Sequence, residues 1–117
     1  MARLIVEAEG TAGTGASQGI AKPGNQLPLY LLVSVTRSSG VPVTGLTAPN
    51  VQVDPIIVAP GGADVTISRM IEPRPGTYLV EVVPIHAGTW RLGRYLFWLA
   101  LKSGVDRGQT VCAVFVD

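Results

Sequence analysis

Apolar and polar residues alternate along several short segments of this chain. In residues 27–36, LPLYLLVSVT, every second residue from the first onward is Leu or Val, so these side chains share one face of an extended strand. Residues 77–85 show the same period, with Tyr78, Val80 and Val82 on the expected inner face. A period of two residues is typical of strands that bury one face and expose the other.

The same pattern predicts seven or eight short strands separated by turns. Sequences rich in Gly, Pro and Asp interrupt the apolar segments, and no segment shows a sustained helical period. We therefore expect an all-β fold, a single antiparallel β-sandwich of about seven or eight strands, with a small barrel as the alternative. The expected strands are 3–8, 27–36, 51–58, 65–71, 77–85, 94–101 and 110–116, and residues 41–50 are expected to form an edge or connecting piece.

Two of these segments carry features that bear on their shape. Pro55 cannot donate a backbone hydrogen bond and is expected to bend its strand. In residues 65–71, VTISRMI, strict alternation places Arg69 on the same face as Val65 and Ile67.

The length of 117 residues suits one domain, and we expect a single β-sandwich domain over residues 1–117. Residues 9–26 are rich in Gly, Ala, Ser and Thr and are expected to form a long loop. Within that segment, residues 14–21, TGASQGIA, resemble the glycine-rich cofactor loop of short-chain dehydrogenases. Such a loop needs a helix after it, whose N-terminus faces the pyrophosphate. Pro23 and Gly24 leave no room for that helix, so no cofactor is expected.

The charged residues are few and dispersed. The net charge is +1, 15% of the residues are charged and 47% are hydrophobic. The Arg residues form no run, so nucleic-acid binding, which uses clustered basic side chains, is not expected. So few charges favour a surface partly covered by a protein partner or a second copy of the chain. A stable β domain coated with Thr, Ser and Gly is the alternative.

The segment 94–101, RYLFWLAL, is apolar on both of its faces. A half-exposed antiparallel strand would carry polar residues on one side, so we expect the second side to be covered by the loop at 9–26 or by another protein chain. Arg and aromatic side chains are enriched at interface centres. The expected interface residues are therefore Arg91, Arg94, Tyr95, Phe97 and Trp98.

Residues with reactive side chains are scarce. The chain has a single His, His86, and a single Cys, Cys112, which lies in an apolar strand and is expected to be a buried thiol. The acidic residues show no recognised pairing and a zinc site would lack ligands, so neither a metal nor enzymatic activity is expected. A small hydrolase or isomerase built around His86 is the least favoured alternative.

The leading functional hypothesis is a non-catalytic protein-interaction or assembly module, with a protein partner or a homo-oligomer expected. Trp90 lies near a loop and is, with His86, the candidate for ligand binding. An exposed Trp90 beside a Tyr could stack on a sugar ring, so a carbohydrate-binding module using exposed aromatic residues is the alternative function.

The sequence also bears on membranes and location. The longest apolar run, residues 95–101, is far shorter than the roughly 20 residues that span a bilayer, so no membrane insertion is expected. In the first ten residues, MARLIVEAEG, Glu7 and Glu9 interrupt the apolar run, so a secretion signal is not expected there. A cytoplasmic location is expected, with signal-free export as the alternative.

Two stretches resemble immunoglobulin-like or transthyretin-like β-sandwich modules. GVPVTGL, residues 40–46, is similar to a turn between early strands of such modules. PGTYLVEVVP, residues 75–84, is similar to a strand in which the Tyr closes a corner of the sandwich. The resemblance covers roughly residues 27–117 and implies a binding or assembly module. The chain departs from antibody-like domains in lacking their pair of cysteines.

Overall fold

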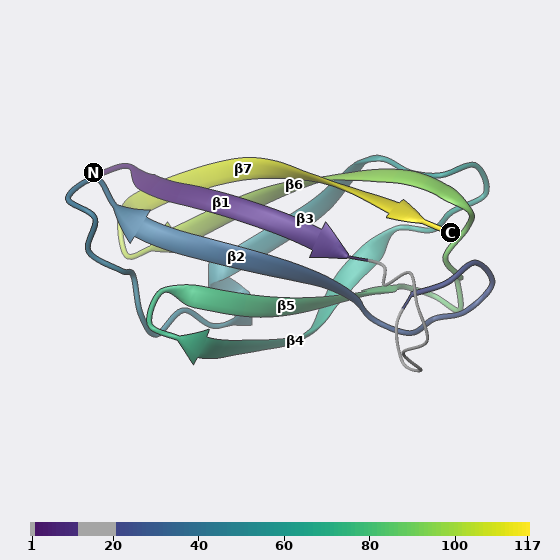
Figure 1. Cartoon of the computed structure of the whole chain (residues 1–117), viewed down its shortest axis with the longest axis horizontal. Helices are drawn as coiled ribbons and strands as arrows, with labels where there is room; N and C mark the ends of the chain where they lie inside the picture. The colour runs from purple at the N-terminus through teal and green to yellow at the C-terminus, as the bar shows by residue number, and fades with distance from the viewer. Residues whose placement is uncertain (1, 12–20) are drawn as a thin grey trace.

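Two antiparallel sheets make up the fold. The structure, a computed structural model, describes residues 2–11 and 21–117. The strands within these residues are β1 (Leu4–Thr11), β2 (Leu29–Arg37), β3 (Val51–Ile57), β4 (Val65–Arg74), β5 (Thr77–Pro84), β6 (Gly93–Ser103) and β7 (Asp106–Val116). One sheet, named the four-stranded sheet, has the order β1-β2-β5-β4, and the other, the three-stranded sheet, has the order β3-β6-β7 (Figure 1).

The expected strands are confirmed as elements, with shifted ends. Strand β1 continues through Thr11, so the segment expected to be a loop from residue 9 begins in a strand. Residues 12–20, which hold most of the TGASQGIA stretch, lie outside the described residues. After them the chain turns at Lys22, whose carbonyl accepts a hydrogen bond from Asn25 N at 3.1 Å. Residues 41–50 form a connection that ends in a short 3-10 turn, Ala48–Asn50.

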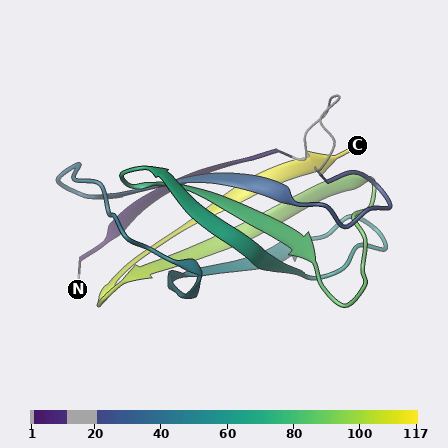
Figure 2. The same cartoon turned by 90° about the horizontal axis from the view of Figure 1, so that it is seen from below.

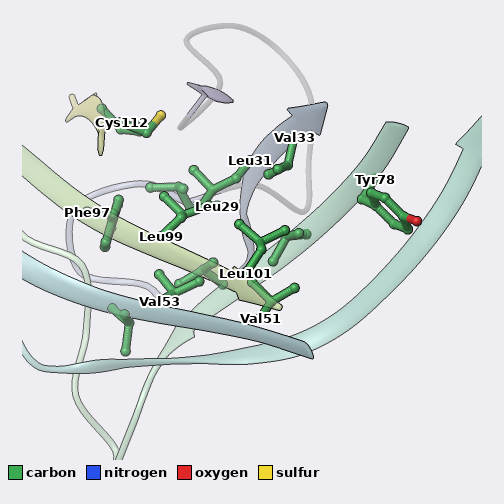
Figure 3. Close-up of a cluster of buried hydrophobic side chains, with 14 of the residues drawn as sticks. Leu29, Leu31, Val33, Val51, Val53, Tyr78, Phe97, Leu99, Leu101 and Cys112 are labelled. Atoms are coloured by element: carbon green, nitrogen blue, oxygen red, sulfur yellow. The ribbon is translucent and has the colours of Figure 1, made fainter. Parts of the chain in front are cut away.

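The core lies between the two sheets, an arrangement compatible with a β-sandwich (Figure 2). Figure 3 shows inward side chains of β2, among them Leu31, facing those of β6, among them Leu99. The alternation predicted for β2 and β5 is confirmed, because their inward residues are fully buried: Leu29, Leu31, Val33, Val35, Tyr78, Val80 and Val82. Leu27, expected on the same face, precedes the strand and is 43% exposed.

Strands β3 and β4 each contain a shift in the register of their pairing with a neighbouring strand. In β3 the pairing with β6 shifts between Pro55 and Ile57, so the strand is irregular at the position where a bend is expected. In β4 the pairing with β5 shifts between Ile67 and Arg69. The extra residue places Arg69 opposite Glu81 on the outer face, so the expectation that Arg69 shares a face with Val65 and Ile67 is wrong.

Strand β1 also lies alongside β7, and the two run in the same direction (Figure 1). Two glycines permit this close approach. A Cβ on Gly108 would lie 2.7 Å from the carbonyl oxygen of Leu4, and one on Gly10 would lie 2.1 Å from Cγ2 of Val114. The side of the molecule formed by β1 and β7 is therefore tightly closed.

The two stretches that carry the family resemblance meet at Tyr78. The Tyr78 hydroxyl donates a hydrogen bond to the carbonyl of Val43 at 2.5 Å and accepts one from Leu46 N at 3.2 Å. Its ring is buried, and burial raises the pKa of the phenol. The side chain therefore fastens the connection between β2 and β3 to the edge of the core.

The carboxylates of Glu72 and Asp106 accept hydrogen bonds that hold turns at one end of the two sheets. Glu72 accepts hydrogen bonds from Gly76 N at 3.0 Å and Gly45 N at 3.1 Å, which lower its pKa. Asp106 accepts one from Ala2 N at 2.7 Å and pairs with Arg37 at 2.6 Å, and these contacts lower its pKa. Asp106 thus links the β6–β7 hairpin to the end of β2 in the other sheet.

Candidate interaction surface

The outer face of the three-stranded sheet carries a cluster of apolar side chains. Cross-strand partners in an antiparallel sheet share a face, and the register pairs Trp98 with Val111, Leu96 with Ala113 and Arg94 with Phe115. On the β3 side, Ile57 lies opposite Leu96. The apolar residues of this surface, named the Trp98 face, are Ile57, Leu96, Trp98, Val111, Ala113 and Phe115.

These side chains remain accessible in the described structure. Phe115 is 57% exposed and Val111 is 54% exposed, while Leu96 and Trp98 are half-buried. The Trp98 indole donates a hydrogen bond from Nε1 to Oε1 of Gln109 at 3.2 Å, which holds the ring along the sheet. An aromatic ring held in this way at a surface offers apolar area at low entropic cost to a partner.

Basic side chains stand at both ends of the Trp98 face. Arg94 lies opposite Phe115 at one end, and Lys102 lies opposite Arg107 at the other. Within the described strands, Asp54 is the one carboxylate on this face, opposite Trp98. The surface is therefore an apolar centre between two cationic ends.

An open groove of about 510 Å³ continues the Trp98 face toward the start of β1. Trp98 and Ala100 supply its apolar wall, and Arg3, Arg107 and Gln109 supply its polar groups. A chain segment with apolar and acidic side chains would match this lining, because the guanidinium groups can donate two parallel hydrogen bonds to a carboxylate.

Two residues expected at an interface lie instead in the core. Tyr95 and Phe97 are fully buried, because they occupy the alternate positions of β6 that face the four-stranded sheet. Their rings stack with centroids 6.0 Å apart, and the Tyr95 hydroxyl accepts a hydrogen bond from Arg91 N at 3.0 Å. The expectation that they form part of a contact surface is therefore wrong, whereas Trp98 does lie at the surface.

Trp90, the candidate for sugar stacking, is also buried. It is 1% exposed, its ring meets Tyr95 edge-on with centroids 5.1 Å apart, and its Nε1 donates to the carbonyl of Leu27 at 2.7 Å. The indole therefore offers no open face to a sugar, and its role is to hold the segment before β2 against the core.

His86, the second ligand candidate, lies exposed in the connection after β5. Gly88 N donates to the carbonyl of Ile85 at 2.9 Å, and the two residues between them, His86 and Ala87, have φ angles of 53° and 60°. These values are typical of a type I′ turn. His86 makes no hydrogen bond or ion pair with the rest of the described chain. Arg91, an expected interface residue, is exposed nearby in the same connection.

The sequence pattern missed part of the Trp98 face. Val111, Ala113 and Phe115 alternate with the buried residues Cys112, Val114 and Val116, so the outer side of β7 is apolar as well as the inner side. That two-sided pattern is the same as the one that marked residues 94–101, and it could have been found in the same way. Cys112 is buried as expected, and burial raises the pKa of its thiol.

Comparisons with family models, with curated proteins and with solved structures give no significant match. Within residues 2–11 and 21–117, no three or more His, Cys, Asp or Glu side chains gather where they could hold a metal ion. No helix in the described part of the chain has the length and apolar character needed to cross a membrane.

Proposed function

We propose that this chain is a non-catalytic protein-interaction module that binds an apolar partner with acidic flanks through the Trp98 face. The observation that supports this most directly is the apolar centre of Leu96, Trp98, Val111 and Phe115 between cationic ends. Exposed apolar patches rimmed by polar groups mark interaction sites in soluble proteins.

The charges of this face favour a different protein over a second copy of the chain. Consider two copies that stack their three-stranded sheets face to face with a twofold axis along the strands. The central strand β6 then faces β6 of the second copy, so Lys102 meets Lys102 and Arg94 meets Arg94. With the axis across the strands, the Arg94 end meets the end that holds Lys102 and Arg107. Both arrangements oppose like charges, whereas an acidic partner is attracted.

The carbohydrate-binding alternative loses its main support, since Trp90 is buried and its ring packs on Tyr95. The hypothesis of a hydrolase built around His86 likewise gains no support, because the imidazole makes no hydrogen bond or ion pair with another described residue and lies exposed. The protein-interaction hypothesis is therefore the one we retain, and a cytoplasmic location stays part of it as a prediction.

We further propose an immunoglobulin-like arrangement for the two sheets. The strand order β1-β2-β5-β4 and β3-β6-β7 corresponds to the ABED and CFG sheets of constant-type immunoglobulin domains. In this correspondence Tyr78, which bonds to Val43 and Leu46, lies on the strand equivalent to E, whereas the conserved corner Tyr of such domains lies on strand F, so the strand order carries the proposal. Domains of this kind commonly present loops or sheet faces to partners.

The binding proposal is tested with two matched substitutions. Val111→Asp places a carboxylate in the Trp98 face, and Leu32→Asp places one at a similarly exposed site on the other sheet, 46% exposed compared with 54%. Each purified protein is immobilised on a support and incubated with an extract of its source cells. Bound proteins are crosslinked to it and quantified.

We expect a protein that the wild type and Leu32→Asp capture and that Val111→Asp loses. Its capture should weaken in about 1 M salt, where the Debye length falls to about 3 Å. If no captured protein distinguishes Val111→Asp from Leu32→Asp, the Trp98 face is not a binding surface and the proposal fails.

A further inference from the structure

The outer face of the four-stranded sheet is built differently from the Trp98 face. Leu32 on β2 lies opposite Leu79 on β5, which in turn lies opposite Ile71 on β4. Leu32 is 46% exposed and Ile71 is 39% exposed. Tyr30 and Glu81 line a hollow beside these residues. The surface around this apolar centre is named the Leu32 face.

The charges at the two edges of the Leu32 face differ in sign, while a further carboxylate, Glu81, lies inside the face on β5, opposite Arg69. Glu7 and Glu9 lie on β1, one outer strand of the sheet, where they pair with Ser34 and Leu32. Arg69 and Arg74 lie on β4, the opposite outer strand. These four side chains form no ion pair or hydrogen bond with each other or with any other described residue. One edge of the face is therefore acidic, the other is basic, and both are available to a partner.

Symmetry decides how a second copy could use this separation. A twofold axis that runs along the strands places β1 of one copy on β4 of the other, and β2 on β5, because the sheet order is β1-β2-β5-β4. Acidic and basic edges then face each other twice. An axis across the strands would place β1 on β1, so that carboxylates oppose carboxylates. Closed twofold pairs are also the commonest form of oligomer in soluble proteins.

We propose that two copies of this chain pair through their Leu32 faces, with the twofold axis along the strands. With this axis, each row of residues that pair across the strands faces the same row of the second copy. Leu32 then packs against Leu79 of the second copy, and Glu7 meets Arg74 of the second copy, since Glu7, Ser34, Thr77 and Arg74 form one row. Tyr30 and Glu81 form another row of the same face. Across the axis, the Tyr30 hydroxyl can therefore donate a hydrogen bond to Glu81 of the second copy.

The size of the face sets the expected strength of the pair. Four strands about 4.8 Å apart, with about eight residues at roughly 3.3 Å each, give a face of roughly 500 Å² in projection. Stable interfaces bury on the order of 800 Å² on each partner. The face is smaller than that, and the register places two ion pairs at its edges, Glu7 with Arg74 of the second copy and the reverse. We therefore expect a weak pair, with a dissociation constant on the order of micromolar.

This pairing is independent of the proposed function. It uses the opposite side of the molecule from Trp98, so either surface can fail its test while the other passes. A dimer of this kind would carry two Trp98 faces pointing outward, which would raise the effective affinity for a partner with two binding segments.

The test measures the dissociation constant by sedimentation velocity over a range of protein concentrations at low salt. We expect the wild type to dimerise, and expect Glu7→Arg and Arg74→Glu each to raise the dissociation constant about tenfold. The double variant Glu7→Arg with Arg74→Glu restores opposite charges across the axis, so its dissociation constant should return to within about threefold of the wild type. Circular dichroism checks that each variant is folded.

The matched apolar variants locate the interface. Leu32→Asp should abolish the dimer and Val111→Asp should leave it unchanged. A wild type that stays monomeric at about millimolar concentration overturns the proposal and indicates that the face is unused or meets another molecule. A double charge variant weaker than both single variants overturns the orientation, and loss of the dimer in Val111→Asp but not in Leu32→Asp assigns it to the Trp98 face instead.

Discussion

At the scale of single residues, the buried aromatic side chains act as fasteners. The polar atoms of Tyr78, Trp90 and Tyr95 each bond to the backbone of a connecting segment while the rings fill the core. A buried ring that satisfies its hydroxyl or N–H in this way contributes packing without leaving a polar group unpaired. These residues are thus committed to structure, and Trp98 is the aromatic residue that β6 presents outward.

Replacing Tyr78 by Phe should show the strength of this fastening. The change keeps the ring but removes the hydrogen bonds to Val43 and Leu46, leaving both backbone groups without that partner. We expect the free energy of unfolding to fall by about 1–2 kcal/mol in urea denaturation. Tyr30→Phe is the control, since the Tyr30 hydroxyl has no hydrogen bond in the described chain, and an equal loss in both variants would contradict the assignment.

The turn at Ala87 offers a stabilising substitution. Its φ of 60° disfavours a residue with a Cβ, whereas Gly adopts this region without that cost. Ala87→Gly should therefore raise the free energy of unfolding by about 0.5–1 kcal/mol, measured by thermal or urea unfolding. The control Ala113→Gly lies in strand β7 and should lower it; a destabilising Ala87→Gly would show that the turn is held by contacts of the methyl group.

At the scale of elements, the alternation of apolar residues predicts where the strands lie along the chain. It does not always predict which face of a strand a residue occupies. The register shift in β4 reverses the expected side of Arg69, and with it the basic edge of the Leu32 face. Strands β6 and β7 extend to Ser103 and Asp106, so the connecting turn is shorter than the sequence pattern suggests. A bulge is set by how two strands pair, and one strand's own sequence shows little of it.

The carboxylate clamps at the turns predict how stability depends on pH. Folding lowers the pKa of Glu72 and of Asp106 below their ordinary values of 4.5 and 3.8. Their stabilisation is therefore present in full above the unfolded pKa values and is lost as the pH falls through the folded ones. We expect the urea midpoint to stay level from neutral pH down to about pH 5 and to fall below it.

Replacing Glu72 shows how much of the loss of stability in acid comes from this carboxylate. Glu72→Gln should lower the urea midpoint at neutral pH and reduce its decline in acid, because the amide keeps the shape of the side chain but cannot titrate. Glu9→Gln is the control, since Glu9 has no hydrogen bond in the described chain. An acid response as steep in Glu72→Gln as in the wild type would assign the decline to other groups.

At the scale of the whole molecule, the closed side formed by β1 and β7 depends on the absence of side chains. A Cβ at Gly108 would meet the backbone of Leu4, which cannot rotate away as a side chain could. Gly108→Ala should therefore lower the free energy of unfolding by about 1–3 kcal/mol in urea denaturation. Thr110→Ala, two residues further along β7, is the control and should cost less; equal losses would show that β1 adjusts freely.

The candidate surfaces were predictable only in part. The two-sided apolar pattern of residues 94–101 pointed to a contact surface, and Trp98 and Arg94 lie on it. An apolar pattern on both sides does not show which side of the strand faces the core, so the sequence alone places Tyr95 and Phe97 at the surface, although both are buried. The position of Trp90 near a loop favours a ligand contact, yet Trp90 is buried, because loops that cross the end of a sheet can be packed as tightly as strands.

The alternation of apolar residues by itself determined that the chain forms short antiparallel strands and which residues of β2 and β5 turn inward, because a strand's side chains alternate with a fixed period of two. Tertiary structure alone decided which of two apolar faces is covered, where the register shifts fall, and how charges from distant strands combine. Those features depend on which strands become neighbours: Glu7 and Arg74 belong to one surface only because β1 and β4 form opposite edges of the same sheet.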